Sequence, residues 1–361
     1  MIIDRYFAKE ILQSLFAVLV VLLLIFMGRY FARYLAWAAE GFIPGSIVVK
    51  MLFLRTIAGL NMILPFGFFL AVLLAFGRFY NDSEMTALSA TGFSLARVMK
   101  SVIIIGLFVA TIVAIFSLYV VPWAHEKAIQ IQEYAAATPI IDSISEGRFN
   151  EVGSPSNSVF YAQRFSEDGV QMFDVFVKIQ NKDGSLEIFT AREGVQTTDK
   201  KTGDRYLELR YGYQYEGTPG RLDFVVHKFQ KSAIRITPRQ IQQRGRGVRT
   251  LPTSVIWNSD DPKHVAEIQW RLSLPISTLI LALLAVLLSK TTPRQGRYAK
   301  LFISILVFVV YNNGIGLAKS WVEQSQVPSY IGIWWLHAIF IVIIYLLYRR
   351  QNKRITLFSR G

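Results

Sequence analysis

Six long apolar stretches dominate this sequence and constrain its fold more than any other feature. A helix needs about 20 apolar residues to cross a hydrocarbon layer of roughly 30 Å. Charged residues make up 18% of the chain, whereas soluble domains have about 25%. We therefore predict a membrane α-helical bundle of six transmembrane helices, three before and three after a polar middle block. The stretches are 11–27, 47–76, 101–121, 270–289, 301–317 and 331–348.

The distribution of charge separates the middle block from its flanks. The formal net charge is +14, but acidic and basic residues are equal in number within 122–268, so the whole excess lies in the apolar flanks. A nucleic-acid-binding domain concentrates its positive charge on a soluble surface, which excludes nucleic acid as a partner. The predicted domains are transmembrane helices 1–3 in 1–121, a β-domain with connecting segments in 122–268, and helices 4–6 with a basic tail in 269–361.

Basic residues also predict the orientation in the membrane. Most Lys and Arg of the flanks lie in the N-terminal segment, in the loops 77–100 and 290–300, and in the C-terminal tail. The positive-inside rule places all four in the cytoplasm and the middle block outside. The first apolar stretch is too long and uninterrupted for a cleavable signal peptide, so it is expected to remain as a helix.

The middle block has the pattern of a β-domain. Apolar and polar residues alternate in several segments within 146–236, and turn residues separate these segments, which favours a sandwich or an open barrel. Within this block, no helical period is expected before residue 265. The Arg-rich segment 239–249 is expected to be a solvated linker rather than an anion-binding arm. The clearest alternation predicts one buried face for Leu207, Leu209, Tyr211, Tyr213 and Tyr215.

The sequence lacks the motifs of an enzyme. It has no cysteine and no phosphate-binding G-x-x-x-x-G-K-S/T loop. His125 and Glu126 do not begin a zinc-binding H-E-x-x-H motif, because residue 129 is Ile. His337 has no acidic neighbour in its apolar stretch and is expected to be a packed histidine. We therefore predict a non-catalytic protein with no metal, cofactor or catalytic residue of its own.

Several basic residues lie near the outer ends of the predicted helices. Ionisable groups at membrane depth tend to face a cavity or a partner, and Arg and Lys suit phosphate. The alternative is that each side chain reaches out to lipid headgroups. Our hypothesis is a cavity for an anionic, phosphorylated lipid at the outer face. The predicted substrate-binding residues are Arg29, Arg33, Arg55 and Lys319.

The cytoplasmic loop 77–100 contains a predicted short helix. Asn81 or Asp82 is expected to cap it, and Gly92 is expected to end it. This helix either lies along the lipid headgroups or docks a cytoplasmic partner that supplies energy. The predicted coupling residues are Asp82, Glu84, Met85, Leu88 and Gly92.

Five short segments, together with the β-domain after the third helix, carry a resemblance to a known family. They are 1–6 (MIIDRY), Ile63-Leu64-Pro65, the Ser83-Glu84 to Gly92 loop, Glu267-Ile268-Gln269-Trp270-Arg271 and Pro293-Arg294-Gln295-Gly296-Arg297. The sequence resembles the permease subunits of the bacterial lipopolysaccharide exporter, the LptF/LptG family of ABC transporters. The last segment favours the LptF branch.

The resemblance implies a transporter in the bacterial inner membrane. It implies pairing with an LptG-type permease, two copies of an LptB-type ATPase that binds the ATP, and a coupling helix around Glu84. It further implies that the phosphates of lipopolysaccharide meet Arg33 and Lys319. The lipid then passes to a periplasmic jellyroll, to LptC and to the periplasmic bridge.

Two other functions are compatible with the residues alone. One is an ABC-type permease of similar layout for another lipid or for a lipoprotein. The other is a membrane-anchored scaffold that presents its β-domain and transports nothing. An ATPase partner is expected for the first and not for the second.

Overall fold

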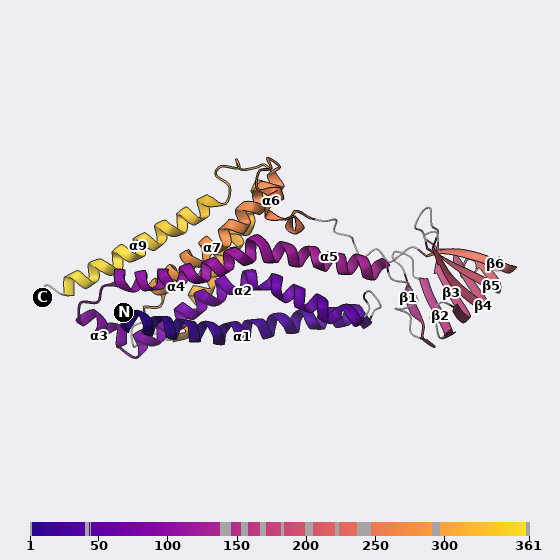
Figure 1. Cartoon of the computed structure of the whole chain (residues 1–361), viewed down its shortest axis with the longest axis horizontal. Coiled ribbons are helices and arrows are strands. Elements are labelled where there is room, and N and C mark those ends of the chain that lie inside the picture. Colours follow the sequence, from indigo (N-terminus) through magenta and orange to yellow (C-terminus); the bar gives the residue numbers. More distant parts are fainter. Residues whose placement is uncertain are drawn as a thin grey trace. The chain divides into compact units, whose positions relative to one another are not determined.

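The computed structural model describes residues 2–39, 43, 45–137, 146–152, 158–166, 171–181, 184–198, 205–220, 224–236, 247–290 and 297–358 (Figure 1). The predicted Arg-rich segment therefore lies outside the described residues up to residue 246. The helices are α1 (Ile2–Ala39), α2 (Gly45–Asn81), α3 (Glu84–Ala90), α4 (Leu95–Ile115), the π-helical turn η1 (Phe116–Val120), α5 (Val121–Ala137), the 3-10 turn η3 (Val248–Thr250), α6 (Thr253–Ile256), α7 (Pro262–Leu288), α8 (Arg297–Glu323) and α9 (Trp334–Phe358). The strands are β1 (Asn150–Val152), β2 (Ser158–Phe165), β3 (Gln171–Gln180), β4 (Leu186–Thr198), β5 (Arg205–Gly217) and β6 (Val225–Ile236).

Five helical stretches among the described residues are long and apolar enough to cross a membrane. This finding confirms a helical membrane domain with an inserted β-domain. The sixth predicted span falls on α9, which is not one of the five, so six spans stay a prediction. The five are Ile2–Ala39, Gly45–Asn81, Leu95–Glu133, Pro262–Leu288 and Leu301–Glu323.

The third span is longer than predicted, because α4, η1 and α5 form one continuous helical stretch. The expectation of no helix in the middle block before residue 265 is wrong, since α5, α6 and the first turn of α7 lie there. Hydropathy does not reveal α5, because its sequence mixes charged and apolar residues. A helix that α4 has already nucleated can nevertheless continue through such a sequence.

The core of the bundle lies around α7. This helix packs against α4, α8 and α9, and 67% of its most apolar window is buried, compared with 11% for α1. Phe68, Phe69, Leu281, Ala285 and Tyr311 are almost completely buried there.

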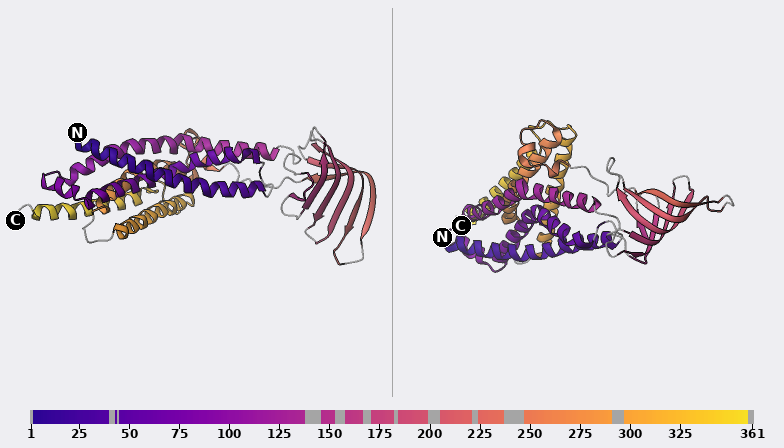
Figure 2. Two further views of the ribbon diagram at one scale, coloured as in Figure 1. Left: turned by 90° about the horizontal axis from the view of Figure 1, so that it is seen from below. Right: turned by 45° about the vertical axis from the view of Figure 1, so that its right-hand side comes forward.

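The middle block contains one six-stranded antiparallel sheet in the order β1-β2-β3-β4-β5-β6. Figure 2 shows the strands side by side in chain order, in a curved sheet. Each strand pairs with the next one along the chain because the connections between them are short. The predicted β-domain is thus confirmed, and the described strands form a single sheet rather than the two of a sandwich.

Strand pairing is interrupted along one row that crosses the sheet. The buried positions of β3, β4 and β5 alternate by two along each strand, but they are three residues apart where the strand crosses this row. In β5, Leu209 and Gly212 are buried on either side of it, whereas Tyr211 is 61% exposed. The row consists of Gln163, Asp174, Arg192, Tyr211 and Gln230.

The predicted single face of β5 is therefore wrong beyond Leu209. Tyr211 has φ 55°, a left-handed conformation that turns the strand, and Tyr213 beyond it is also exposed. Asp174 has φ 52° in the same row. We call this set of five residues the crease.

Candidate functional site

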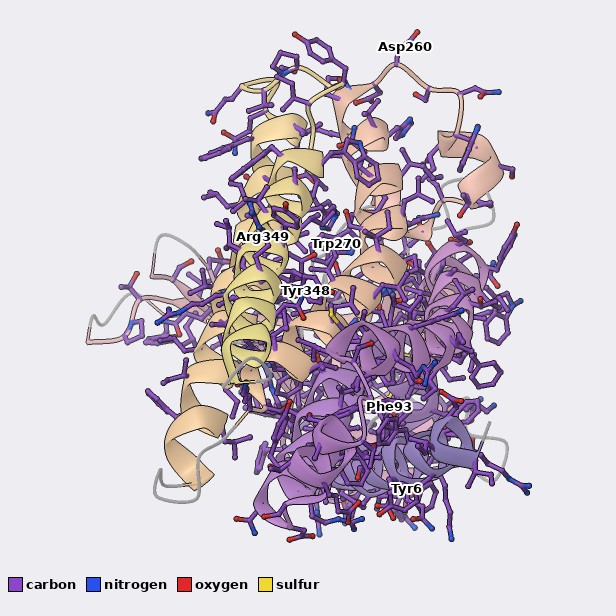
Figure 3. The ribbon with its side chains drawn as sticks, turned by 90° about the vertical axis from the view of Figure 1, so that its left-hand side faces the viewer. Tyr6, Phe93, Asp260, Trp270, Tyr348 and Arg349 are labelled. Atoms are coloured by element: carbon purple, nitrogen blue, oxygen red, sulfur yellow. The ribbon has the colours of Figure 1, made fainter. Side chains whose placement is uncertain are left out.

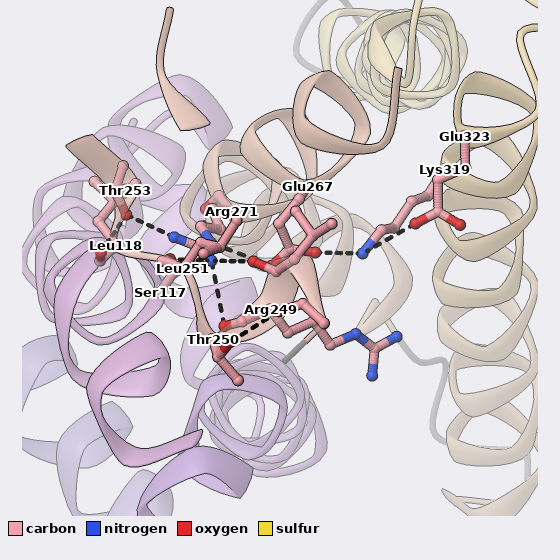
Figure 4. Close-up of polar contacts among 12 residues, drawn as sticks. Ser117, Leu118, Arg249, Thr250, Leu251, Thr253, Glu267, Arg271, Lys319 and Glu323 are labelled. Carbon is pink, nitrogen blue, oxygen red and sulfur yellow. Dashed lines mark hydrogen bonds and ion pairs between the residues drawn. The ribbon is translucent and has the colours of Figure 1, made fainter. Parts of the chain in front are cut away.

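Three charged side chains form a buried ion network between α7 and α8 (Figure 4). One carboxylate oxygen of Glu267 lies 3.1 Å from Nε of Arg271, and the other lies 2.5 Å from Nζ of Lys319. The three side chains are only 3–8% exposed. Glu267 and Arg271 are four residues apart, so one face of α7 presents both. A single carboxylate thus serves two buried cations.

Arg271 also holds the chain segment that leads into α7. Its Nη1 donates to the hydroxyl of Thr253 at 2.8 Å. Its Nη2 lies 3.4, 3.3 and 3.0 Å from the carbonyl oxygens of Val248, Arg249 and Leu251. Each nitrogen of the guanidinium group is therefore engaged, and the planar fork of Arg suits such a set of acceptors.

Lys319 is the less saturated of the two buried cations. Besides Glu267, its ammonium lies 3.6 Å from a carboxylate oxygen of Glu323, whose side chain is 40% exposed. It also lies 5.2 Å from the centre of the Trp270 ring, a cation–π distance. Buried charges need compensation, and the described residues supply Lys319 with one short hydrogen bond only.

Two further arginines lie at the same end of the bundle. His125 is within electrostatic reach of Arg55, Arg249, Arg271 and Glu267. Arg55 is half-buried and Arg249 is exposed. We define the cationic cluster as Arg55, Arg249, Arg271 and Lys319.

The sequence predicted two members of the cationic cluster, Arg55 and Lys319, and missed the other two. The spacing of Glu267 and Arg271 was a usable signal, because an acid and a base four residues apart at the edge of an apolar run often pair. The predicted residues Arg29 and Arg33 are exposed on α1. The Arg33 guanidinium lies 5.6 Å from the centre of the Tyr30 ring. A role for these two arginines in binding stays a prediction.

The predicted coupling helix is α3, and the protein's own core holds it in place. Met85 is buried, and Leu88 packs against the same core. The hydroxyl of Tyr6 donates to the carboxylate of Glu84 at 3.0 Å. Tyr6 and Phe93, both labelled in Figure 3, lie next to Phe7 of the core, with ring centres 6.3 and 6.2 Å from its ring. Of the predicted acidic pair, Asp82 is exposed and Glu84 is half-buried.

The ends of α3 match the prediction on one side only. Gly92 has φ 82°, and the N–H groups of Phe93 and Gly92 donate to the carbonyls of Leu88 and Ser89. This pattern is a Schellman motif, so the predicted stop at Gly92 is confirmed. The predicted cap at Asn81 or Asp82 is wrong. α2 continues to Asn81, and the residue before α3 is Ser83, which makes no side-chain cap hydrogen bond.

A second buried polar group joins α7, α8 and α9. The hydroxyl of Tyr311 lies 2.7 Å from Nδ1 of His337 and 3.2 Å from the hydroxyl of Ser277. Nε2 of His337 lies 3.0 Å from the hydroxyl of Ser273. His337 is therefore a packed histidine with neutral partners, as predicted. In the described part of the chain, no group of His, Asp and Glu could hold a metal ion.

Comparison with known proteins supplies the identity of this bundle. The profile of the family described as "Lipopolysaccharide export system permease LptF/LptG" matches residues 5–350. The chain belongs to this family. It is 28% identical over 344 residues to the lipopolysaccharide export system permease protein LptF of Escherichia coli strain K12, which covers 95% of this chain and 93% of the relative. The LptF proteins of Escherichia coli O157:H7 and Shigella flexneri match equally well.

Membership in the LptF/LptG family confirms the resemblance, including its closeness to LptF. The chain is a multi-pass membrane permease of the lipopolysaccharide export system. A permease component has a non-catalytic role. The buried ion network and α3 are therefore features of a transport protein.

Proposed function

We propose that this permease extracts lipopolysaccharide from the inner membrane as one half of a heterodimer with an LptG-type permease. A separate dimer of an LptB-type ATPase binds and hydrolyses the ATP, since this sequence has no phosphate-binding loop of the common type. The observation that carries the proposal is the cationic cluster, in which Arg271 and Lys319 are buried, within a family of lipopolysaccharide permeases. Such a cluster suits a phosphorylated lipid better than a neutral one.

The phosphates of the lipid bind first at Lys319 and Arg55. Lys319 supports this step, because its ammonium has a single short hydrogen bond and a half-exposed second acid beside it. Arg29 and Arg33 on α1 are two further basic residues that contact the lipid. Such contacts are expected to weaken with salt where the side chains are exposed, and less where they are buried.

The helix α3 couples the bundle to the ATPase. Asp82 and Glu84 present their charges to the partner, while Met85 and Leu88 fix the helix to the core and Gly92 ends it. Because buried side chains attach α3 to the bundle, a movement of α3 that the ATPase causes is transmitted directly to α1 and α2. No flexible loop separates α3 from this packing. Both termini and α3 lie in the cytoplasm, in line with the positive-inside rule.

The β-sheet receives the lipid on the periplasmic side. One face of the sheet carries a continuous apolar cluster that includes Phe160, Val177, Phe189 and Leu209, which suits acyl chains. From there the lipid passes to LptC and to the periplasmic bridge.

Purification of the intact complex tests this proposal. The chain is expressed with an affinity tag in its native membrane, and mass spectrometry identifies the proteins and lipids that co-purify. We expect an LptG-type permease, an LptB-type ATPase, LptC and lipopolysaccharide. Recovery of another lipid, or of no ATPase, contradicts the proposal.

Photocrosslinking tests the substrate contacts. A photoreactive residue at position 33, 55 or 319 is expected to form adducts with lipopolysaccharide more often than one at Phe16, which is 72% exposed on α1. Equal yields at all four positions contradict the assignment.

A charge reversal tests the coupling role of α3. Glu84→Lys is expected to abolish recovery of the ATPase with the permease. The matched control is Thr86→Lys, two residues along the same helix and exposed. If the ATPase co-purifies normally with the Glu84→Lys variant, the coupling role of α3 is contradicted.

A further inference from the structure

We propose that Glu267 is a displaceable counter-ion of Lys319. It neutralises the ammonium when no lipid phosphate is bound, and it withdraws to Arg271 alone when a phosphate takes its place. This inference rests on the proposed contact between Lys319 and the lipid, and it adds a residue that opposes binding.

The two oxygens of Glu267 make this exchange possible. One oxygen pairs with Arg271 at 3.1 Å and the other with Lys319 at 2.5 Å. When Lys319 is taken over by another anion, the carboxylate keeps its pair with Arg271. A buried carboxylate without any partner is strongly unfavourable. The shared arrangement avoids that state at every step.

Of the two buried cations, Lys319 is the one that can receive the incoming anion. Arg271 already uses Nε for Glu267, Nη1 for Thr253 and Nη2 for three backbone carbonyls. A phosphate at Arg271 would have to break the contacts that hold 248–253. Lys319 is a compact charge with rotatable donors. Its second acidic neighbour, Glu323, lies 3.6 Å from the ammonium, farther than Glu267, and is half-exposed.

The charges of the buried network favour the same exchange. Two buried cations share one buried carboxylate, so the three groups together carry one positive charge. A phosphate monoanion brings the group to neutrality. Glu267 then competes with the phosphate for Lys319, and this competition weakens binding enough for the lipid to leave. A transporter that must release its cargo needs such an opposing interaction.

Removal of the charge on Glu267 tests the inference, because it is expected to strengthen binding. The intact complex is placed in nanodiscs loaded with lipopolysaccharide, and release into excess empty vesicles is timed. Glu267→Gln is expected to release the lipid about tenfold more slowly than the unmodified complex. The effect is expected to disappear in the double variant Glu267→Gln/Lys319→Ala. Glu323→Gln, which removes the more distant acid, is expected to slow release by less.

The controls separate this inference from the proposed function. If Lys319→Ala holds the lipid as well as the unmodified complex, the proposed contact with Lys319 fails. If Lys319→Ala loses lipid but Glu267→Gln releases it at the unmodified rate or faster, the counter-ion role fails. Where Glu267→Gln does not fold, Glu267→Asp is used instead. The shorter side chain keeps a carboxylate to pair with Arg271, and its distance to the ammonium of Lys319 is longer. Slower release is then expected from that variant, and unchanged release overturns the inference.

Discussion

The ammonium of Lys319 lies 2.5 Å from a carboxylate oxygen of Glu267, and each side chain is less than one-tenth exposed. The pair joins the start of α7 to the end of α8, residues that are 52 positions apart in the sequence. Desolvation offsets much of the attraction in such a pair, so its presence is weak evidence for stability. Its value lies in what it connects, since Arg271 continues the network to the segment that enters α7.

Arg271→Met is expected to release the segment 248–253. The variant removes the donors to Thr253 and to three carbonyls, and it leaves Glu267 with Lys319 alone. Truncation of a buried, hydrogen-bonded charge is expected to cost about 3–5 kcal/mol of unfolding free energy. Hydrogen–deuterium exchange of peptides from 247–256 measures the release, and we expect much faster exchange there.

Arg249→Met is the matched control for Arg271→Met. Arg249 accepts from Arg271 through its backbone carbonyl, and its side chain is exposed. Exchange in 247–256 is therefore expected to stay normal in this variant. Equal acceleration in both variants would mean that Arg271 is not what fixes the segment.

Met85→Ala is expected to loosen α3 from the bundle. Met85 is 3% exposed, and truncation of a buried Met costs about 2–5 kcal/mol. Thr86→Ala, at the neighbouring exposed position, is expected to change stability by less than about 0.5 kcal/mol. Thermal unfolding of the purified complex and exchange in 83–92 measure both effects. If both variants lose a similar amount of stability, burial of Met85 is not what attaches α3 to the bundle.

Gly92→Ala isolates the backbone requirement at the end of α3. No heavy atom lies within 4 Å of the added Cβ, but φ is 82°, so the cost comes from conformation alone and is expected to be about 1 kcal/mol. Gly77→Ala has the same open space inside α2. It is expected to stabilise the helix by roughly 0.5–1 kcal/mol. Opposite signs in chemical unfolding are the expected result.

The crease makes a paired prediction for β5. Tyr211→Gly is expected to stabilise the sheet by about 1 kcal/mol, because glycine adopts φ 55° without strain. Gly212→Ala is expected to destabilise it by about 3 kcal/mol, because the added Cβ would lie 2.0 Å from the Thr190 carbonyl oxygen. Amide exchange in β4 and β5 measures both changes. A tolerated alanine at 212 would contradict the close approach of the strands.

Acid is expected to weaken the β-domain through Glu208. Lys231 and Arg210, at 2.8 and 2.9 Å, hold the pKa of this carboxyl below its ordinary value of 4.5. A group whose pKa is lowered by folding contributes stability above its unfolded pKa and loses it as pH falls through the folded pKa. Exchange in β5 and β6 is therefore expected to accelerate below about pH 4.5. Glu208→Gln is expected to remove this part of the acid response.

The sequence predicted the elements whose cause is local. Apolar runs mark α2 and α7 because lipid and core both select apolar side chains over a fixed length. Gly92 marks the end of α3 because few other residues adopt its φ. Alternation marks the strands because successive side chains point to opposite faces.

The remaining features arise from contacts between distant segments. α5 has no apolar run and exists as the continuation of α4. The crease requires an interruption at matching positions of neighbouring strands, and the sequence of a single strand does not reveal it. The Glu267–Arg271 spacing was visible in the sequence, but Lys319 joins that pair only after α7 and α8 have packed. Burial of Met85 likewise depends on the fold of the bundle.

The crease also limits how this domain can change in evolution. Each of the strands β2 to β6 has one residue at that row, and these strands keep their register on both sides of it. Loss of a single residue from β4 would turn half of that strand inside out relative to its neighbours. Shortening of the sheet at this point would require matching deletions in several strands at once. The lengths of neighbouring strands are thus coupled through their pairing on both sides of the crease.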